Sequence, residues 1–418
     1  MHKNISARIG SVLLSAAILT SLLPAGALAA EASFADTEGH WAESAIERWS
    51  DYGVVAGLGD GTFAPDAELT RAEMAQVYVN LFHLTEKADI SSFTDIPAGA
   101  WYADAVAKCV AAGILNGTSG TTFSPLAPVT REQMFAAFGR SLGIAPAETT
   151  NSTLYDLGQV SDWARGTVNA LLNAGYVTGT ASNTLFPLAD INRASVMALL
   201  DQSVAGYGSQ PGATVATEDK DGLVLVVSGD VTVTGQVGDL VIAQGAAEGT
   251  VHLEDATVTG TVTLSAPSVK LNITGGTKVE KLVVSGQATH AEITVEKDAS
   301  VNDLTTEAQG TIVSGQGTVS RVEAVEGSAN VTVTTSGTTI ENNSSSSVTT
   351  DKGEVKPGNT GSTTKPSTGG GSSSGGSVSS DLTISEAKTV TGGTYQNVTI
   401  AYSVGDDTVI LDGVTITG

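Results

Sequence analysis

The stretch Trp41–Glu73, WAESAIERWSDYGVVAGLGDGTFAPDAELTRAE, decides the fold of the N-terminal part because its spacing recurs twice further along the chain. Three tryptophans anchor the copies, namely Trp41, Trp101 and Trp163. From each anchor, glycine follows at 12 and 16 residues, proline at 24 and arginine at 30. Self-similarity at a fixed period is typical of a repeat architecture, so we expect three copies of one supersecondary unit.

Each copy is predicted to fold as helix, loop and helix. From Trp41, apolar side chains recur at helical spacing as far as Tyr52, and Gly53 stands where a left-handed residue ends a helix. Thr70 and Glu73 form a capping box at the start of the second helix. The equivalent pairs are Thr130 with Gln133 in the second copy and Asn192 with Ser195 in the third. Because Ser195 is not acidic, we expect the third helix start to be the least firmly fixed.

An arginine occupies the first position of the second helix in every copy, at Arg71, Arg131 and Arg193. A cation there faces the positive end of the helix dipole, which is mildly unfavourable, so we expect a compensating partner. Two explanations remain open. The guanidinium beside free helix-start amides can form a carboxylate or phosphate site, or it can form a salt bridge with a repeat aspartate such as Asp36.

These motifs resemble the S-layer homology repeat. The first copy has Gly53-Val54-Val55-Ala56-Gly57, Asp60-Gly61-Thr62-Phe63-Ala64-Pro65 and Thr70-Arg71-Ala72-Glu73. The second copy matches nearly as well, with Phe93-Thr94-Asp95 and Thr130-Arg131-Glu132-Gln133. The third copy is looser, since Leu154 replaces the leading aromatic residue. The resemblance covers roughly residues 34 to 203 of the 418 in the chain.

This resemblance implies a pseudo-threefold helical bundle that binds a secondary cell-wall polysaccharide linked to peptidoglycan, in grooves between the repeats. In that family the terminal sugar is pyruvylated, and its carboxylate meets the motif arginine. The implied polymer-binding residues are Asp36, Trp41, Gly57, Arg71, Asp95, Trp101, Gly117, Arg131, Asp156, Trp163, Gly179 and Arg193. The second glycine of each loop would let the ligand approach the backbone. For the tryptophans, packing in the core remains the alternative.

Beyond residue 213 the periodicity changes from helical to strand-like. Short runs rich in Val, Thr and Leu, such as Leu223–Val227, are typical of strands. Apolar residues recur at steps of 22, 20, 22 and 18, at Leu240, Val262, Leu282, Leu304 and Val322. This spacing predicts a β-solenoid with one coil for about 20 residues, and a β-sandwich is the alternative.

The two ends of the chain differ from these regions. Lys3 and Arg8 precede an apolar stretch that ends in Ala27-Leu28-Ala29, which predicts a secretory signal peptide. Residues 343–380 are mostly Ser, Gly, Thr and Pro, which predicts a disordered linker. The chain is therefore expected to be an α + β multidomain protein. Its predicted order is signal peptide 1–29, repeats 34–86, 93–144 and 154–203, β-solenoid 213–342, linker 343–380 and a short β-helix-like segment 381–418.

Composition excludes several classes of function. With 20 Lys+Arg and 44 Asp+Glu the net charge is −24, which disfavours nucleic acid and anionic membranes as partners. The one cysteine, Cys109, is predicted to be a buried apolar residue, and Asp406-Asp407 a solvated turn rather than a calcium site. Carboxylates are scattered through the β region and nucleophile motifs are missing. We therefore expect no catalytic residue, no metal, no cofactor and no membrane insertion.

The sequence thus predicts an exported protein of the cell wall and cell surface that is not an enzyme. The repeats would anchor it non-covalently, and the β region would act as a stalk or adhesive module that self-assembles or binds a surface ligand. Local arginines can still bind an anionic polymer, because salt screens the charge of the rest of the chain beyond about 8 Å. Two alternatives remain, a lattice-forming S-layer protein and a wall-anchored β-helix enzyme that degrades polysaccharide.

Overall fold

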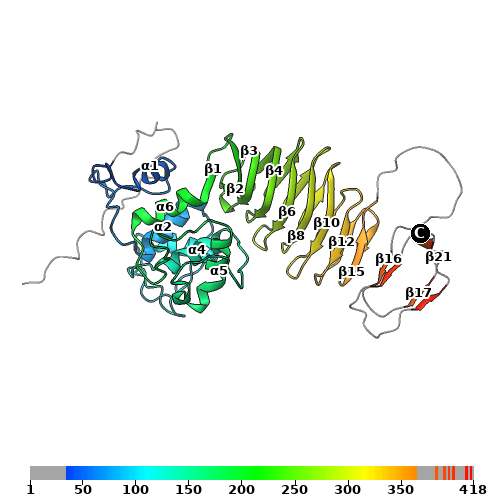
Figure 1. The fold of residues 1–418 in the computed structure, drawn as a ribbon, viewed down its shortest axis with the longest axis horizontal. Coiled ribbons are helices and arrows are strands. Elements are labelled where there is room, and N and C mark those ends of the chain that lie inside the picture. The colour runs from blue at the N-terminus through cyan, green and yellow to red at the C-terminus, as the bar shows by residue number, and fades with distance from the viewer. Residues whose placement is uncertain are drawn as a thin grey trace, which may run out of the picture. The chain divides into compact units, whose positions relative to one another are not determined.

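The computed structural model describes residues 34–364 and six short strands between residues 382 and 416 (Figure 1). The chain divides into two compact units, Met1–Pro366 and Ser367–Gly418. The predicted signal peptide, residues 1–29, lies outside the described residues. Within the described part, no helix combines the length and the apolar character that a membrane span needs.

The N-terminal part is helical, as predicted. Its helices are α1 (Glu43–Asp51), α2 (Arg71–Phe82), α3 (Ala103–Ala111), α4 (Arg131–Ser141), α5 (Asp162–Asn173) and α6 (Arg193–Ser203), with a short 3-10 helix η1 (Leu157–Gln159). Two residues after the end of the first helix of each repeat stands a glycine with positive φ, at Gly53 (+73°), Gly113 (+69°) and Gly175 (+75°). The capping box of Thr70 and Glu73 is present, and Asn192 Oδ1 accepts a hydrogen bond from the Ser195 amide at 2.9 Å.

The three repeats close into a ring through the segments that precede their second helices. The Leu69 amide donates to the Ile191 carbonyl at 2.9 Å, Ile191 donates to Val129 at 2.8 Å, and Val129 donates to Leu69 at 2.9 Å. All three side chains are buried in one core. Each repeat therefore pairs with both others, which confirms the predicted pseudo-threefold bundle.

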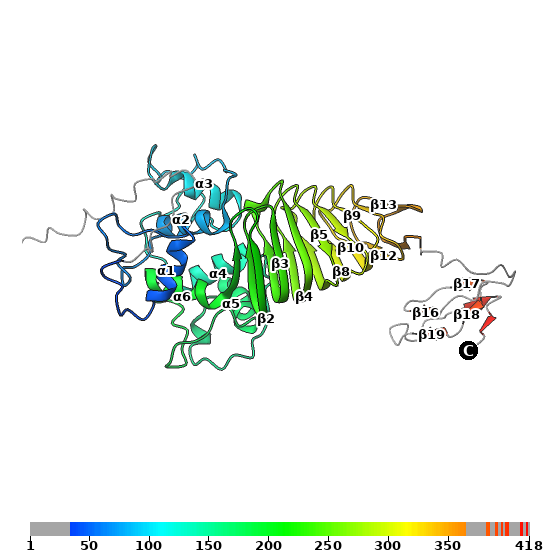
Figure 2. The same cartoon turned by 90° about the horizontal axis from the view of Figure 1, so that it is seen from above.

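The β part of the first unit is a solenoid of parallel strands, which Figure 2 shows from above. It opens with β1 (Val204–Gly208), β2 (Thr214–Val226), β3 (Val231–Ile242), a 3-10 helix η2 (Gln244–Ala246) and β4 (Thr250–Leu264). After β4 the strands form two stacks. One consists of β6 (Lys278–Val284), β8 (Ser300–Thr306), β10 (Thr318–Ala324) and β12 (Thr339–Asn342), and the other of β5 (Lys270–Thr274), β7 (Glu292–Val295), β9 (Ile312–Ser314) and β11 (Thr332–Val333).

The predicted apolar recurrence sets the register of the solenoid. Leu240 pairs with Val262, Val262 with Leu282, Leu282 with Leu304, and Leu304 with Val322 in successive parallel strands. Each of these five side chains is fully buried. The β-solenoid prediction is confirmed, and the β-sandwich alternative is wrong because neighbouring strands in this stack run parallel.

The prediction of a disordered linker from residue 343 is wrong for residues 343–364. Three strands form there, namely β13 (Val348–Thr350), β14 (Gly353–Val355) and β15 (Asn359–Ser362). β14 and β15 pair antiparallel with β13 and β12 and so cover the last coil. Buried Val348 and Val355 supply apolar contacts, and the Asn342 side chain donates to the Ser346 and Val355 carbonyls at 2.8 and 2.7 Å. Polar side chains that are satisfied internally thus replace a larger apolar core.

The helical bundle and the solenoid share a core. Helix α6 ends at Ser203 and β1 begins at Val204, without a linker between them. The Tyr207 ring packs against Trp49 and Tyr52, with centroids 5.4 and 4.9 Å away, and its hydroxyl donates to the Leu81 carbonyl at 2.8 Å. The β structure therefore starts before residue 213 and is packed directly on the bundle.

The second unit contains three pairs of short parallel strands. They are β16 (Leu382–Ile384) with β19 (Val398–Ile400), β17 (Thr389–Thr391) with β20 (Ile410–Asp412), and β18 (Thr394–Tyr395) with β21 (Thr415–Ile416). Pairing of the first three strands with the next three, in order, is the pattern of two successive coils. Asp406-Asp407 and residues 365–380 of the predicted linker lie outside the described residues.

Candidate functional site

Each motif arginine reaches from its own repeat into the next one. Arg71 donates from Nε to the Phe123 carbonyl at 2.8 Å and from Nη2 to the Asn116 carbonyl at 2.7 Å. The equivalent acceptors are the carbonyls of Phe63 and Ala56 for Arg193, at 2.9 and 3.0 Å, and of Leu185 for Arg131, at 2.7 Å. Among residues 34–364, none of the three forms a salt bridge with a carboxylate. The salt-bridge explanation is therefore wrong, and main-chain carbonyls compensate the cation.

The motif aspartates bind the same loops from the other side. Asp36 accepts from the Phe63 amide at 2.8 Å and from the Ala64 amide at 2.7 Å. Asp95 does so for Phe123 and Ser124, and Asp156 for Leu185 and Phe186. Burial alone would raise the pKa of Asp36, but the two amide bonds outweigh it and the pKa lies below its usual value. The aspartates thus fix the loops that the arginines contact.

The amides at the start of the second helices are occupied. The Arg71 amide donates to the Ala127 carbonyl at 3.0 Å, and the Ala72 amide donates to the Pro125 carbonyl at 2.8 Å. The second and third repeats make the same bonds, from Arg131 to Ala189, Glu132 to Pro187, Arg193 to Ala67 and Ala194 to Pro65. The prediction of free helix-start amides is therefore wrong, and a bound carboxylate would depend on the guanidinium alone.

The anchoring tryptophans lie on the surface. Trp41, Trp101 and Trp163 are 66%, 38% and 58% exposed, whereas Trp49 on α1 is fully buried. Packing in the core is therefore the wrong explanation for the three anchors. Exposed indole rings near a groove can stack on the apolar face of a ligand.

The second glycine of each loop has a packing role. A Cβ on Gly57 would lie 2.5 Å from the Phe34 ring, and one on Gly117 would lie 2.6 Å from the Phe93 ring. Gly179 packs in the same way against Leu154. These glycines make room for the leading apolar side chain of their own repeat, which differs from the ligand contact that the resemblance implies.

One groove brings together predicted site residues from different repeats. It has a volume of about 280 Å³ and is lined by Trp41, by Arg131 with Phe135 on α4, by Thr178 and Thr180, and by Ser195 and Gln202 on α6. The Arg131 guanidinium lies 5.3 Å from the centre of the Phe135 ring. Sequence reasoning missed Phe135, although its spacing of four residues from Arg131 places both on one helix face.

Arg131 differs from the other two arginines in its accessibility. Arg71 and Arg193 are each 7% exposed and use two nitrogens on carbonyls, whereas Arg131 is only half-buried. Within the described part of the chain, Leu185 provides the one carbonyl that Arg131 contacts. Burial lowers the pKa of Arg131 while the charge of Asp156 opposes the shift, so the guanidinium stays protonated at neutral pH.

Comparison with known proteins gives one family match at each of the three repeats. The S-layer homology domain model matches residues 33–75, 92–135 and 153–197. Exoglucanase XynX of Acetivibrio thermocellus is 30% identical over 42% of this chain and 17% of its own length. Surface-layer 125 kDa protein of Lysinibacillus sphaericus is 28% identical over 47% of this chain and 17% of its own length. S-layer protein EA1 of Bacillus anthracis is 26% identical over 49% of this chain and 24% of its own length.

This chain therefore spans a quarter or less of the length of each of these relatives. Their names describe both an enzyme and surface-layer proteins, and each match covers less than half of the present chain. The family model matches the same three stretches of sequence that form the closed ring of helix–loop–helix units. The chain thus carries three S-layer homology domains, one in each repeat.

Proposed function

We propose that the three S-layer homology domains anchor an exported protein non-covalently to the cell wall. The partner would be secondary cell-wall polysaccharide linked to peptidoglycan, and the solenoid would be displayed at the cell surface. The observation that carries this proposal is the groove in which an exposed tryptophan of one repeat stands beside an accessible arginine of another. The surface-layer relatives support the same location.

The groove of Trp41 and Arg131 is the binding site that we propose first. The Arg131 guanidinium would bind the carboxylate of a pyruvylated sugar, and Trp41 would stack on the sugar ring. Thr178, Thr180 and Ser195 would supply hydroxyl groups along the walls. Arg71 and Arg193 are buried and already hold two carbonyls each, so we propose that their sites contribute less.

Co-sedimentation of the full chain with wall sacculi of its source organism tests this proposal. Chemical removal of the secondary polymer from the sacculi should abolish sedimentation of the chain. Trp41→Ala should weaken binding without unfolding, because its side chain is 66% exposed, and Arg131→Gln should weaken it further. Tyr155→Ala is the matched control, since Tyr155 is 82% exposed and does not line the groove.

Binding that survives both polymer removal and Trp41→Ala would contradict the proposal. A loss caused equally by Tyr155→Ala would show that general surface apolarity, rather than the groove, holds the chain on the wall. Circular dichroism of each variant separates loss of the site from loss of the fold.

We also propose that the β part has a display role rather than a catalytic one. The S-layer relatives favour lattice formation as a second candidate function, and the exoglucanase relative makes hydrolysis worth testing. Electron microscopy of the purified chain would reveal an ordered lattice. Release of reducing sugars from wall polysaccharide would reveal an enzyme and would contradict the display role.

A further inference from the structure

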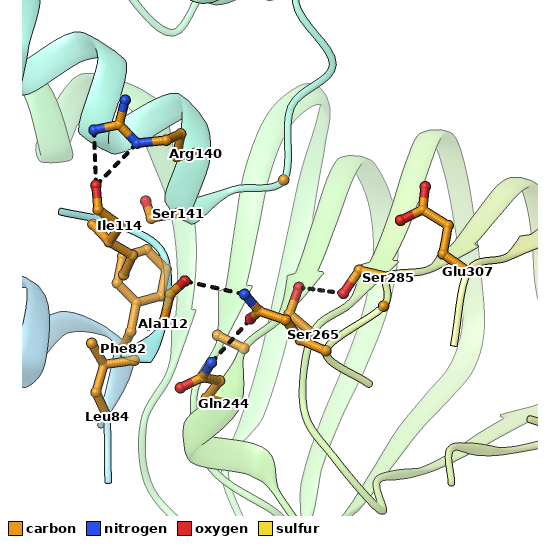
Figure 3. Close-up of a pocket in the computed structure, with 14 residues that line it drawn as sticks. Phe82, Leu84, Ala112, Ile114, Arg140, Ser141, Gln244, Ser265, Ser285 and Glu307 are labelled. Atoms are coloured by element: carbon orange, nitrogen blue, oxygen red, sulfur yellow. Dashed lines mark hydrogen bonds between the residues drawn. The ribbon is translucent and has the colours of Figure 1, made fainter. Parts of the chain in front are cut away.

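A cleft lies where the helical bundle meets the solenoid. Two cavities of about 260 and 280 Å³ form it, and both are lined by Gly143, just after α4, and by Glu307, just after β8. Figure 3 shows the first cavity, with Arg140 on one side and Glu307 on the other. We call these two cavities, which share Gly143 and Glu307 in their linings, the junction cleft. None of its residues belongs to the groove of Trp41 and Arg131.

The walls of the junction cleft are fixed by contacts across the seam. Gln287 donates to the Ala112 carbonyl at 3.1 Å and accepts from Gln244 at 3.0 Å. In the lining of the second cavity, the Tyr176 hydroxyl donates to the Asp239 carboxylate. The cleft is therefore formed before any ligand arrives, which is typical of small-ligand and glycan sites.

Two cations line the cleft without a carboxylate partner. Arg140 is held by the Ile114 carbonyl, which accepts from Nε at 3.0 Å and from Nη2 at 2.8 Å. Lys281 is exposed on β6, in the second cavity. Among residues 34–364 neither side chain forms a salt bridge, although the chain carries 44 acidic residues. A cation that is held in a cleft but left unpaired favours an anionic ligand.

The remaining lining suits a polyhydroxylated molecule. Six hydroxyl side chains face the two cavities, from Ser141, Ser265, Ser285, Thr261, Thr263 and Thr305. Ile144 and Val283 add apolar surface of the kind that contacts the CH groups of a sugar ring. Glu307 stands between the cavities and can accept hydrogen bonds from sugar hydroxyls.

We propose that the junction cleft binds an acidic oligosaccharide. Carboxylates of successive sugars contact Arg140 and Lys281, and ring hydroxyls contact the serines, the threonines and Glu307. Because both walls are required, the site depends on the packing of the bundle against the solenoid. It uses residues separate from the proposed anchoring groove, so the two sites can succeed or fail independently.

Isothermal titration of the full chain with hexameric oligogalacturonate tests this site, because that probe carries a carboxylate on every sugar. The fully methyl-esterified hexamer is the uncharged counterpart. We expect the acid to bind and the ester to bind at least about tenfold more weakly. Lys281→Gln should weaken binding of the acid by about tenfold. Lys278→Gln, on the same strand but outside the cleft, should leave it unchanged.

Three results would overturn the proposal. These are absence of binding by the unmodified chain, equal binding of acid and ester, and an equal effect of Lys278→Gln and Lys281→Gln. Trp41→Ala separates the two sites, since it should reduce sedimentation with sacculi and leave the titration with oligogalacturonate unchanged. Loss of oligogalacturonate binding in Trp41→Ala would assign the acid to the other groove.

Discussion

At the scale of single residues, the backbone of one residue, Phe63, shows how the bundle is held. The Phe63 amide donates to Asp36 of its own repeat, and the Phe63 carbonyl accepts from Arg193 of the third repeat. The Arg193 guanidinium also lies 4.3 Å from the centre of the Phe63 ring. Asp36 and Arg193 thus fix the loop between them. The same motif residues that could bind a ligand therefore also stabilise the fold.

Replacement of the buried arginine should be costly for this reason. Arg193→Gln removes two hydrogen bonds from a side chain that is 7% exposed and leaves two carbonyls unpaired. We expect a loss of about 2–4 kcal/mol in the free energy of unfolding. Arg131→Gln should cost less, because Arg131 is half-buried and makes one such bond. Urea unfolding followed by tryptophan fluorescence measures both, and an equal cost would contradict this ranking.

At the scale of elements, the three second helices share a first position but differ in their caps. The Thr70 amide donates to Glu73 Oε2 at 2.8 Å, whereas Ser195 cannot return such a bond to Asn192. We expect Ser195→Glu to complete the capping box of α6 and to stabilise the chain by about 0.5–1 kcal/mol. Urea unfolding is the measurement. Glu47→Gln, a change at a partly buried position of α1 that takes no part in a helix cap, serves as the control. A destabilised Ser195→Glu would refute the cap argument.

Truncating a side chain in the apolar stack of the solenoid should lower the stability of the protein. Leu282 is fully buried between Val262 and Leu304 of the neighbouring coils. Leu282→Ala should cost about 2–5 kcal/mol, because the adjacent coils hold the cavity open. Lys278→Ala, on the same strand, should change the stability by less than about 0.5 kcal/mol. Thermal unfolding followed by far-UV circular dichroism compares the two variants.

Elements that are marked by a regular spacing of glycine or apolar residues could be predicted from the sequence. The helix ends at Gly53 and its equivalents and the apolar stack from Leu240 to Val322 follow from spacing alone. The partners of the arginines could not be predicted, because they are main-chain carbonyls of another repeat and leave no pattern in the side chains. The strands within 343–364 were missed because the side chains of Asn342, Thr350 and Thr363 form internal hydrogen bonds, whereas composition alone treats such polar residues as solvent-exposed.

At the scale of the whole molecule, His83 sits where the bundle meets the solenoid. Burial lowers its pKa from the usual 6.5, and a hydrogen bond to the Val227 backbone opposes the shift only in part. The folded protein therefore takes up the proton at a lower pH than the unfolded chain does. Stability should be unaffected above pH 6.5 and should fall as the pH drops below it, until His83 itself is protonated in the folded state.

The variant His83→Asn isolates this contribution. Asn tolerates the left-handed conformation of this residue, whose φ is +50°. Urea unfolding of both proteins between pH 5 and 7.5 should show a smaller loss of stability on acidification for the variant. Parallel pH profiles would mean that His83 does not contribute to the acid sensitivity.

The closed ring of repeats also has a consequence for the order of assembly. A chain emerges from the ribosome or from an export channel with its N-terminus first, yet the Leu69 amide and the Phe63 carbonyl find their partners at Ile191 and Arg193. The first repeat therefore lacks these hydrogen bonds until the third repeat has emerged. The bundle can then close only as a whole, and a chain cut short before residue 193 cannot form a partial anchor with this geometry.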